Sequence, residues 1–166
     1  MVEKPLEDTV ESATKLVEAA EAANVPLLTG HHRQHSPIMG KARAVVQSGV
    51  LGPIVAVMGS SVFYKPDDYF EVGGGWRRQP GGGPILLNLI HEVNNLMSLV
   101  GDIVTVQAMT SNATGGFPVE DTAAILFRFA NDALGFMLSD TASSARSWEQ
   151  MSQENKDYST YQDEDA

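Results

Sequence analysis

The feature that most constrains the fold is a run of three predicted strands that follows a single helix without another helix between them. The strands are expected at 104–111, 122–130 and 133–139, where apolar residues gather between turn signals. Asn131 and Asp132 separate the last two strands and are typical of a tight hairpin turn. These segments therefore predict an antiparallel meander.

Helices and strands alternate before this meander. The order strand, long loop, helix and then consecutive strands favours an α+β fold: an open, largely antiparallel sheet with helices on one face. It disfavours a doubly wound parallel sheet. The loop is longer than a connection requires, which is more typical of a functional segment. The first expected helix is capped by Asp8 or Thr9 and reaches about Ala23. The other expected elements are a helix at 37–48, strands at 25–28 (short and buried) and 54–63, and the loop at 64–83.

The predicted strand at 122–130 is apolar on both of its faces. Since side chains alternate along a strand, one face carries Ala124, Leu126 and Arg128. We expect helices to cover one face and a partner chain to cover the other, which predicts a homo-oligomer formed through the open sheet. The other face carries Ala123, Ile125, Phe127 and Phe129.

A glycine triplet at 81–83 introduces the helix that precedes the meander. Glycine allows a positive φ and a close approach to another group, Pro84 suits the first helical turn, and Gly101 suits the helix end. At about 100° per residue, the apolar residues fall on one arc and His91 falls on the opposite, polar arc. Periodicity leaves two alternatives, a solvated surface helix or a polar face that points into a cleft. The polar arc holds Asn88, His91, Glu92 and Asn95.

Composition excludes several classes of protein. The chain has 166 residues, 43% of them hydrophobic, which suffices for the core of an ordinary domain. There is no cysteine, no apolar run near 18 residues and no signal peptide, so we expect a cytoplasmic protein without a membrane span. Six acids and one lysine between 149 and 166 supply −5 of the net charge of −10. No basic stripe is present, so no nucleic-acid partner is expected.

The histidine-rich segment at 30–36 is not expected to bind a metal. His31, His32 and His35 lie in a predicted loop and have no carboxylate at ligand spacing.

Four segments, taken in order, resemble the Gfo/Idh/MocA oxidoreductases, the group of glucose-fructose oxidoreductase and inositol dehydrogenase. The resemblance extends over roughly residues 1–146, and the ordered series is more specific than any one segment. The segments are Glu3-Lys4-Pro5, Arg33 and Pro37 within 30–37, Gly49 to Ile54, and Trp76-Arg77 followed by 81–91.

The resemblance implies hydride transfer between NAD or NADP and a sugar, polyol or related substrate. It implies that Lys4 and His91 are catalytic, with the lysine beside the nicotinamide and the histidine as proton donor or acceptor. The chemistry agrees, because histidine titrates near working pH and can take the proton of a hydroxyl group. The implied cofactor-binding residues are Glu3, Lys4, Pro5 and Arg33, and the implied substrate-binding residues are Trp76, Arg77, Asn88 and His91.

The arginines after Trp76 leave two alternatives open. Arg77 and Arg78 either clamp an anionic group of the substrate with a guanidinium fork or are solvated beside a tryptophan that packs the loop.

The sequence departs from the family pattern in two ways. Asn88 and Asn94 stand where many members carry aspartate, and asparagine cannot exchange a proton. The phosphate-binding pattern Gly-x-Gly-x-x-Gly does not occur. We therefore interpret 1–30 as a remnant of a nucleotide-binding Rossmann domain, 31–146 as a substrate and oligomerisation domain, and 147–166 as an acidic tail. Such a fragment is expected to be weak or inactive alone; the alternative is a non-catalytic binding or oligomerisation module.

Overall fold

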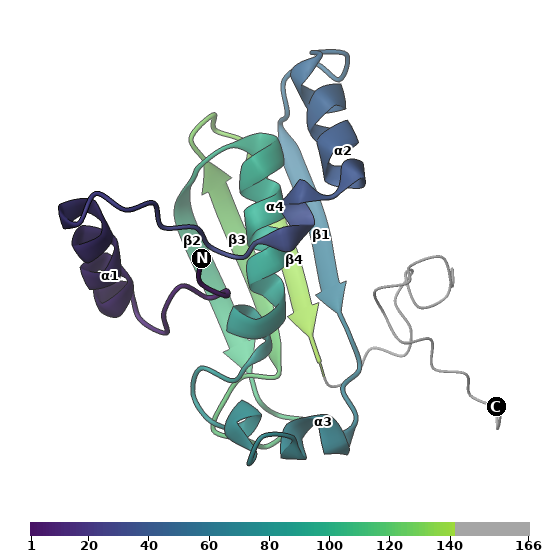
Figure 1. The fold of residues 1–166 in the computed structure, drawn as a ribbon. Coiled ribbons are helices and arrows are strands. Elements are labelled where there is room, and N and C mark those ends of the chain that lie inside the picture. Colours follow the sequence, from purple (N-terminus) through teal and green to yellow (C-terminus); the bar gives the residue numbers. More distant parts are fainter. Residues whose placement is uncertain (142–166) are drawn as a thin grey trace.

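The computed structural model describes residues 1–141, and the predicted tail at 147–166 lies outside them (Figure 1). A four-stranded sheet has the order β1-β4-β3-β2. The pairs β2–β3 and β3–β4 are antiparallel and β1–β4 is parallel, so the predicted open, largely antiparallel sheet is confirmed. The strands are β1 (Ala56–Val62), β2 (Ile103–Ser111), β3 (Thr122–Phe129) and β4 (Leu134–Asp140).

Three helical segments, α4, α2 and η1, lie on one face of this sheet, whereas α1 stands apart from it and α3 lies near its lower end (Figure 1). In Figure 1, α4 lies across the sheet, and α2 and the 3₁₀ turn η1 pack against it from the same side. The α-helices are α1 (Val10–Ala22), α2 (Pro37–Gln47), α3 (Asp67–Glu71) and α4 (Ile90–Val100). The other turns are the 3₁₀ helices η1 (His32–His35) and η2 (Trp76–Arg78) and the π-helix η3 (Ile85–Leu89).

The core lies between α4 with η3 and the sheet. Leu89 and Phe129 are fully buried there, and burying a side chain of this size stabilises the fold by about 1.5–3 kcal/mol. The alternation predicted for β3 is confirmed, because Ile125 and Phe127 face the core whereas Leu126 is 53% exposed. The sheet therefore has one covered face and one open face.

Side-chain caps begin the first two helices where the sequence predicts. Thr9 Oγ1 accepts a hydrogen bond from the backbone N–H of Ser12 at 3.2 Å, and Ser36 Oγ accepts one from Met39 at 3.2 Å. Pro37 follows as the first residue of α2. At the hairpin between β3 and β4, Asp132 has a φ of 64°, as a tight turn requires.

The prediction of a short buried strand at 25–28 is wrong. Val25 and Leu28 are 55% and 60% exposed, and this segment forms no ladder. Its neighbourhood has only an isolated bridge, in which Val2 pairs with Thr29. A strand needs a neighbour along its whole length, whereas among residues 1–141 the N-terminal segment reaches only the end of 25–28, where Val2 N–H donates to Leu28 O.

The helix predicted from Pro84 to Val100 is not a regular α-helix. Residues Ile85–Leu89 form a π-helix, and the α-helix proper begins at Ile90. Each π-helical residue turns through a smaller angle than an α-helical one, so a fixed angle per residue misplaces the first turn. The predicted loop at 64–83 also differs, because it contains α3 and η2.

Candidate active site

The glycine triplet holds the long loop against the start of η3. Gly81 has a φ of 90°, which L side chains rarely adopt. A Cβ atom on Gly82 would lie 2.6 Å from the backbone of Trp76 and Arg77. On Gly83 it would collide with the carboxylate of Glu120. The predicted positive φ and close approach are both present, and they fix the loop beside the helix that carries His91.

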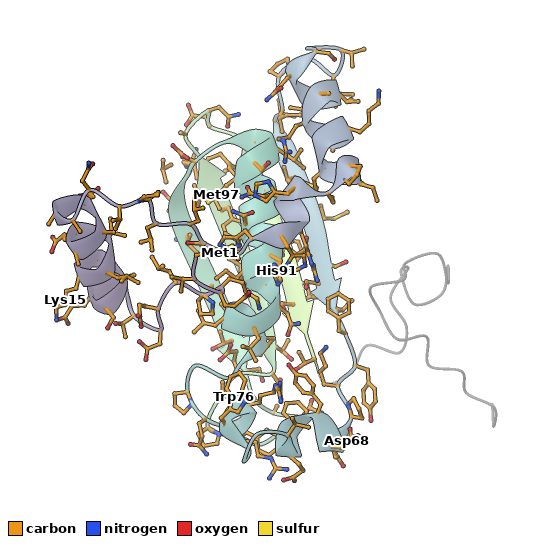
Figure 2. All side chains as sticks on the ribbon, in the orientation of Figure 1. Met1, Lys15, Asp68, Trp76, His91 and Met97 are labelled. Atoms are coloured by element: carbon orange, nitrogen blue, oxygen red, sulfur yellow. The ribbon has the colours of Figure 1, made fainter. Side chains whose placement is uncertain are left out.

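His91 lies in the first turn of α4 and is only 6% exposed. Its ring centroid lies 5.1 Å from that of His32 and 6.4 Å from that of His31, in edge-on arrangements. Figure 2 shows His91 near the middle of the molecule. The polar arc was predicted correctly, but the solvated alternative is wrong for His91, because η1 covers it.

Ionic and hydrogen-bonding contacts fasten η1 to α4. Arg33 Nη1 forms an ion pair with Glu92 Oε1. Arg43 Nη1 from α2 donates to the carbonyl of Gln34 at 2.7 Å and to Ser98 Oγ at 3.0 Å. The role of Glu92 was missed, although its place next to His91 on the polar arc was the signal for it.

Lys4 reaches the site from the N-terminal segment. Its Nζ donates to the carbonyl of Leu87 in η3 at 2.6 Å. The N-terminal segment is held alongside because Val2 N–H donates to Leu28 O at 2.8 Å and Gly30 N–H donates to Val2 O at 2.8 Å. Burial lowers the pKa of Lys4, Arg33 lowers it further, and Glu3 partly opposes the shift.

The surroundings of His91 disfavour its charged form. Burial, followed by Arg33, Lys4, His32 and His31, lowers the pKa of His91 from 6.5 to about 4. The imidazole is therefore neutral at pH 7. Among the residues that the structure describes, its Nδ1 atom is buried without a hydrogen-bond partner. A neutral ring with a free nitrogen is suited to accept a proton.

The remaining predicted site residues lie around this centre or at one end of it. Glu3 is exposed and its carboxylate is close to Gly30, and Pro5 is half-buried after a cis Lys4-Pro5 bond. Asn88 and Arg77 both line a cavity of about 170 Å³. Trp76 is 43% exposed near the lower end of the molecule in Figure 2, away from His91.

Neither a metal-binding cluster nor a membrane-spanning helix is found among residues 1–141. In this part of the chain, no three histidine or acidic side chains are grouped so as to hold one metal ion. None of its helices is both long and apolar enough to cross a membrane.

Comparison with known proteins identifies the family. The sequence profile of the GFO/IDH/MocA C-terminal domain matches residues 39–154. The chain belongs to the GFO/IDH/MocA family. The predicted resemblance is thereby confirmed, and its named relatives are oxidoreductases.

Two GFO/IDH/MocA relatives illustrate this. The chain is 31% identical over 119 residues to the 1,5-anhydro-D-fructose reductase of Ensifer adhaerens, a match that covers 69% of this chain and 34% of that protein. It is 26% identical over 141 residues to the myo-inositol 2-dehydrogenase of Thermotoga maritima, covering 80% of this chain and 40% of the relative. The chain thus matches well under half the length of either protein.

Solved structures share the fold of this GFO/IDH/MocA chain. The WlbA dehydrogenase of Chromobacterium violaceum, solved with NADH and UDP-GlcNAcA, superposes with a TM-score of 0.80 at 25% identity, over 87% of this chain and 42% of that one. Levoglucosan dehydrogenase, solved with NADH and levoglucosan, gives 0.76 at 22% identity, over 87% and 42%. The mixed α/β fold with one open sheet is therefore that of the family's C-terminal domain.

Proposed function

We propose that this chain forms the substrate side of an NAD(P)-dependent oxidoreductase that transfers hydride to or from a hydroxyl-bearing carbon of a sugar or polyol. The observation that carries the proposal is the convergence of two distant segments on one histidine. Lys4 and Arg33 act electrostatically on His91, which is buried, neutral and has a free ring nitrogen. The reductases and dehydrogenases among the relatives support the same reaction class.

His91 is the proton acceptor in the oxidative direction. As the alcohol becomes a carbonyl, the hydrogen on carbon leaves with its bonding electrons as hydride, to the oxidised nicotinamide, and the O–H proton passes to the imidazole. In the reductive direction the imidazolium returns that proton to the new hydroxyl oxygen. A pKa below neutrality keeps the accepting form populated before the reaction.

Lys4 is the group that polarises the reacting oxygen. Its ammonium is held by the Leu87 carbonyl, so two of its three protons remain to donate to a substrate. An ammonium beside the oxygen stabilises the negative charge that develops there during transfer. The Lys4 ammonium also disfavours protonation of His91, which keeps the imidazole in the form that accepts a proton.

The residues present fit the reactive end of a nicotinamide cofactor. A bound nicotinamide supplies or accepts the hydride, and Lys4, Arg33, Glu3 and Pro5 are the side chains that would hold that end. The free Nδ1 atom of His91 is an open polar group of the kind a bound ligand satisfies. The sequence has no Gly-x-Gly-x-x-Gly turn, so the pyrophosphate is assigned to no residue of this chain.

The proposal is tested by turnover of the enzyme in which this chain is joined to a nucleotide-binding domain. His91→Ala is expected to lower kcat by ~10²- to 10⁴-fold, the usual loss when an acid-base group is removed. His35→Ala is the matched control, since His35 is an exposed histidine of η1, the turn that covers His91. Equal turnover of the two variants would move the proton transfer away from His91.

A second candidate function, assembly, is favoured by the open face of the sheet. Leu126 of β3 pairs with Phe136 of β4, which pairs with Met58 of β1, and all three side chains are substantially exposed. We propose that a second copy of this chain covers this face, because large apolar patches on soluble proteins mark interfaces. A chain that associates while His91→Ala leaves turnover unchanged would be an assembly module.

A further inference from the structure

The cavity beside η3 lies at the end of the sheet where β1 and β4 finish. Lys65 follows β1, Thr141 follows β4, and Leu87 and Asn88 bound the cavity from the π-helix. Its volume of about 170 Å³ is below the ~300–1,000 Å³ of pockets that enclose a whole ligand. The cavity is therefore large enough for one functional group of a ligand, and the rest of that ligand would lie outside it.

Two cations in this cavity flank one aromatic ring. Lys65 Nζ lies 4.9 Å from the centroid of the Tyr69 ring, and the guanidinium carbon of Arg77 lies 4.4 Å from it. Arg77 Nη1 is oriented by the carbonyls of Tyr69 and Val72, at 3.1 and 3.3 Å. The ring and these carbonyls therefore hold both charges at the cavity without neutralising them.

Neither cation has an acidic partner in the described part of the chain. No carboxylate of 1–141 forms an ion pair with Lys65 or Arg77, and Arg77 Nε is buried without an acceptor. Arg78 differs, because it pairs with Glu71. Within 1–141 the Nε atoms of both arginines lack an acceptor, so Arg77 is distinguished from Arg78 by having no carboxylate partner.

Two of the acids that line the cavity are committed to other contacts. Glu120 Oε1 accepts from the backbone N–H of Ile85 at 3.2 Å, at the start of η3. Asp121 Oδ2 accepts from Gly115 N–H at 2.7 Å and from Thr114 N–H at 3.1 Å. The third, Asp67, is exposed in the first turn of α3. None of these three carboxylates forms an ion pair with Lys65 or Arg77, so both cations remain available to a ligand.

The electrostatic environment of Lys65 supports this reading. Burial lowers its pKa, and Arg77 and then Arg33 lower it further. An ammonium destabilised by like charges gains more from an anion than a solvated one does. Arg33 also lowers the pKa of His91, so this one arginine acts electrostatically on both Lys65 in the cavity and His91 in the candidate active site.

The cavity is one helical turn from the proposed reaction centre. Asn88 precedes His91 by three residues, and Leu87, which also lines the cavity, accepts a hydrogen bond from the Lys4 ammonium through its carbonyl. We propose that the cavity binds an anionic group of the substrate, a carboxylate or a phosphate carried by the sugar, with Lys65 and Arg77 as its ligands. The inference rests on the proposed function for the hydroxyl that reacts at His91.

Equilibrium binding to the purified chain tests the inference, because every proposed ligand residue is on it. Glucose, glucuronate and glucose 6-phosphate are titrated separately at low ionic strength, followed by the NMR shifts of backbone amides at 64–88. We expect at least one anionic sugar to bind about tenfold more tightly than glucose, since a charge-assisted hydrogen bond contributes on this scale. The preferred anion identifies the group as carboxylate or phosphate.

Three variants assign the preference to the cavity. Lys65→Met should reduce the affinity for the anionic sugar to that for glucose, and Lys65→Arg should retain most of the preference. Lys15→Met is the matched control, because Lys15 is an exposed lysine of α1, away from the cavity (Figure 2). Equal affinities for the three sugars, or a preference that survives Lys65→Met, would overturn the inference. The proposed function would stand in either case if His91→Ala still lowered kcat by ~10²- to 10⁴-fold.

Discussion

At the scale of single residues, His91 is controlled by basic neighbours that come from distant parts of the chain. Arg33 and Lys4 follow burial as the largest causes of its lowered pKa. Arg33 itself is paired with Glu92, the residue next to His91. The ion pair holds the Arg33 guanidinium beside the imidazole, and the Glu92 carboxylate is engaged by that arginine. The nearby positive charge disfavours protonation of His91 and keeps it neutral.

The role of Arg33 as a positioning residue gives a prediction about His91. Arg33→Gln removes the second-largest cause of the shift and frees the Glu92 carboxylate, so the pKa of His91 should rise from about 4 toward 6.5. The titration of the His91 ring protons by NMR measures this. Arg128→Gln is the control, because Arg128 forms an exposed pair with Asp132. A His91 pKa that stays at about 4 would exclude this role.

Protonation of His91 also predicts how stability varies with pH. Its pKa in the folded chain is about 4, below the unfolded value of 6.5, so the unfolded chain binds the proton more readily. The stabilising contribution is present above pH 6.5 and is lost as the pH falls from 6.5 toward 4. Urea midpoints across this range should fall less steeply for His91→Gln than for the wild type. Parallel curves for the two proteins would contradict the shift.

At the scale of elements, the glycine triplet couples the long loop to η3. Gly82→Ala should destabilise the chain by about 1–3 kcal/mol, because the added Cβ meets the backbone of η2 at 2.6 Å and backbone cannot give way cheaply. Gly40→Ala is the matched control: Gly40 lies inside α2 with open space around it, and alanine there should stabilise by about 0.5–1 kcal/mol. Urea denaturation measures the free energy of unfolding of both variants. Equal changes in the two would refute the close approach at Gly82.

The elements also show which patterns can be predicted from sequence. The sheet, its alternation in β3 and the capped helix starts follow from local rules, and the structure confirms them. The π-helix does not follow from local rules, because its register depends on long-range hydrogen bonds. Lys4 donates to the carbonyl of Leu87, and Glu120 accepts from the N–H of Ile85. Val25–Leu28 fails for a similar reason, since an apolar run becomes a strand only beside a neighbour.

Most residues of the candidate site could be predicted from the sequence, but their arrangement in space could not. Lys4, Arg33 and His91 were named through the family resemblance, and the structure brings them together. Periodicity placed His91 on the polar arc but had no means of showing that η1 covers it. Glu92 and Lys65 were missed because single charged residues on a helix or loop carry no pattern of their own.

At the scale of the whole molecule, the sheet separates two surfaces of different character. The covered face carries α4 and the candidate active site (Figure 1). The open face is apolar across three strands, with exposed Met58, Leu126 and Phe136 in register. An interface there would leave the candidate active site free, so the proposed assembly and the proposed catalysis would use different surfaces.

This separation gives the last prediction. If a second copy covers the open face, Leu126→Lys places a charge at the centre of the interface and should weaken association by about 10- to 100-fold, as loss of a buried leucine implies. Val10→Lys is the control, because Val10 is equally apolar but lies exposed on α1. Sedimentation velocity over a range of concentrations measures both. A wild type that remains monomeric throughout would refute the interface, as would equal dissociation of Leu126→Lys and Val10→Lys, because only the former changes the face that the strands leave open.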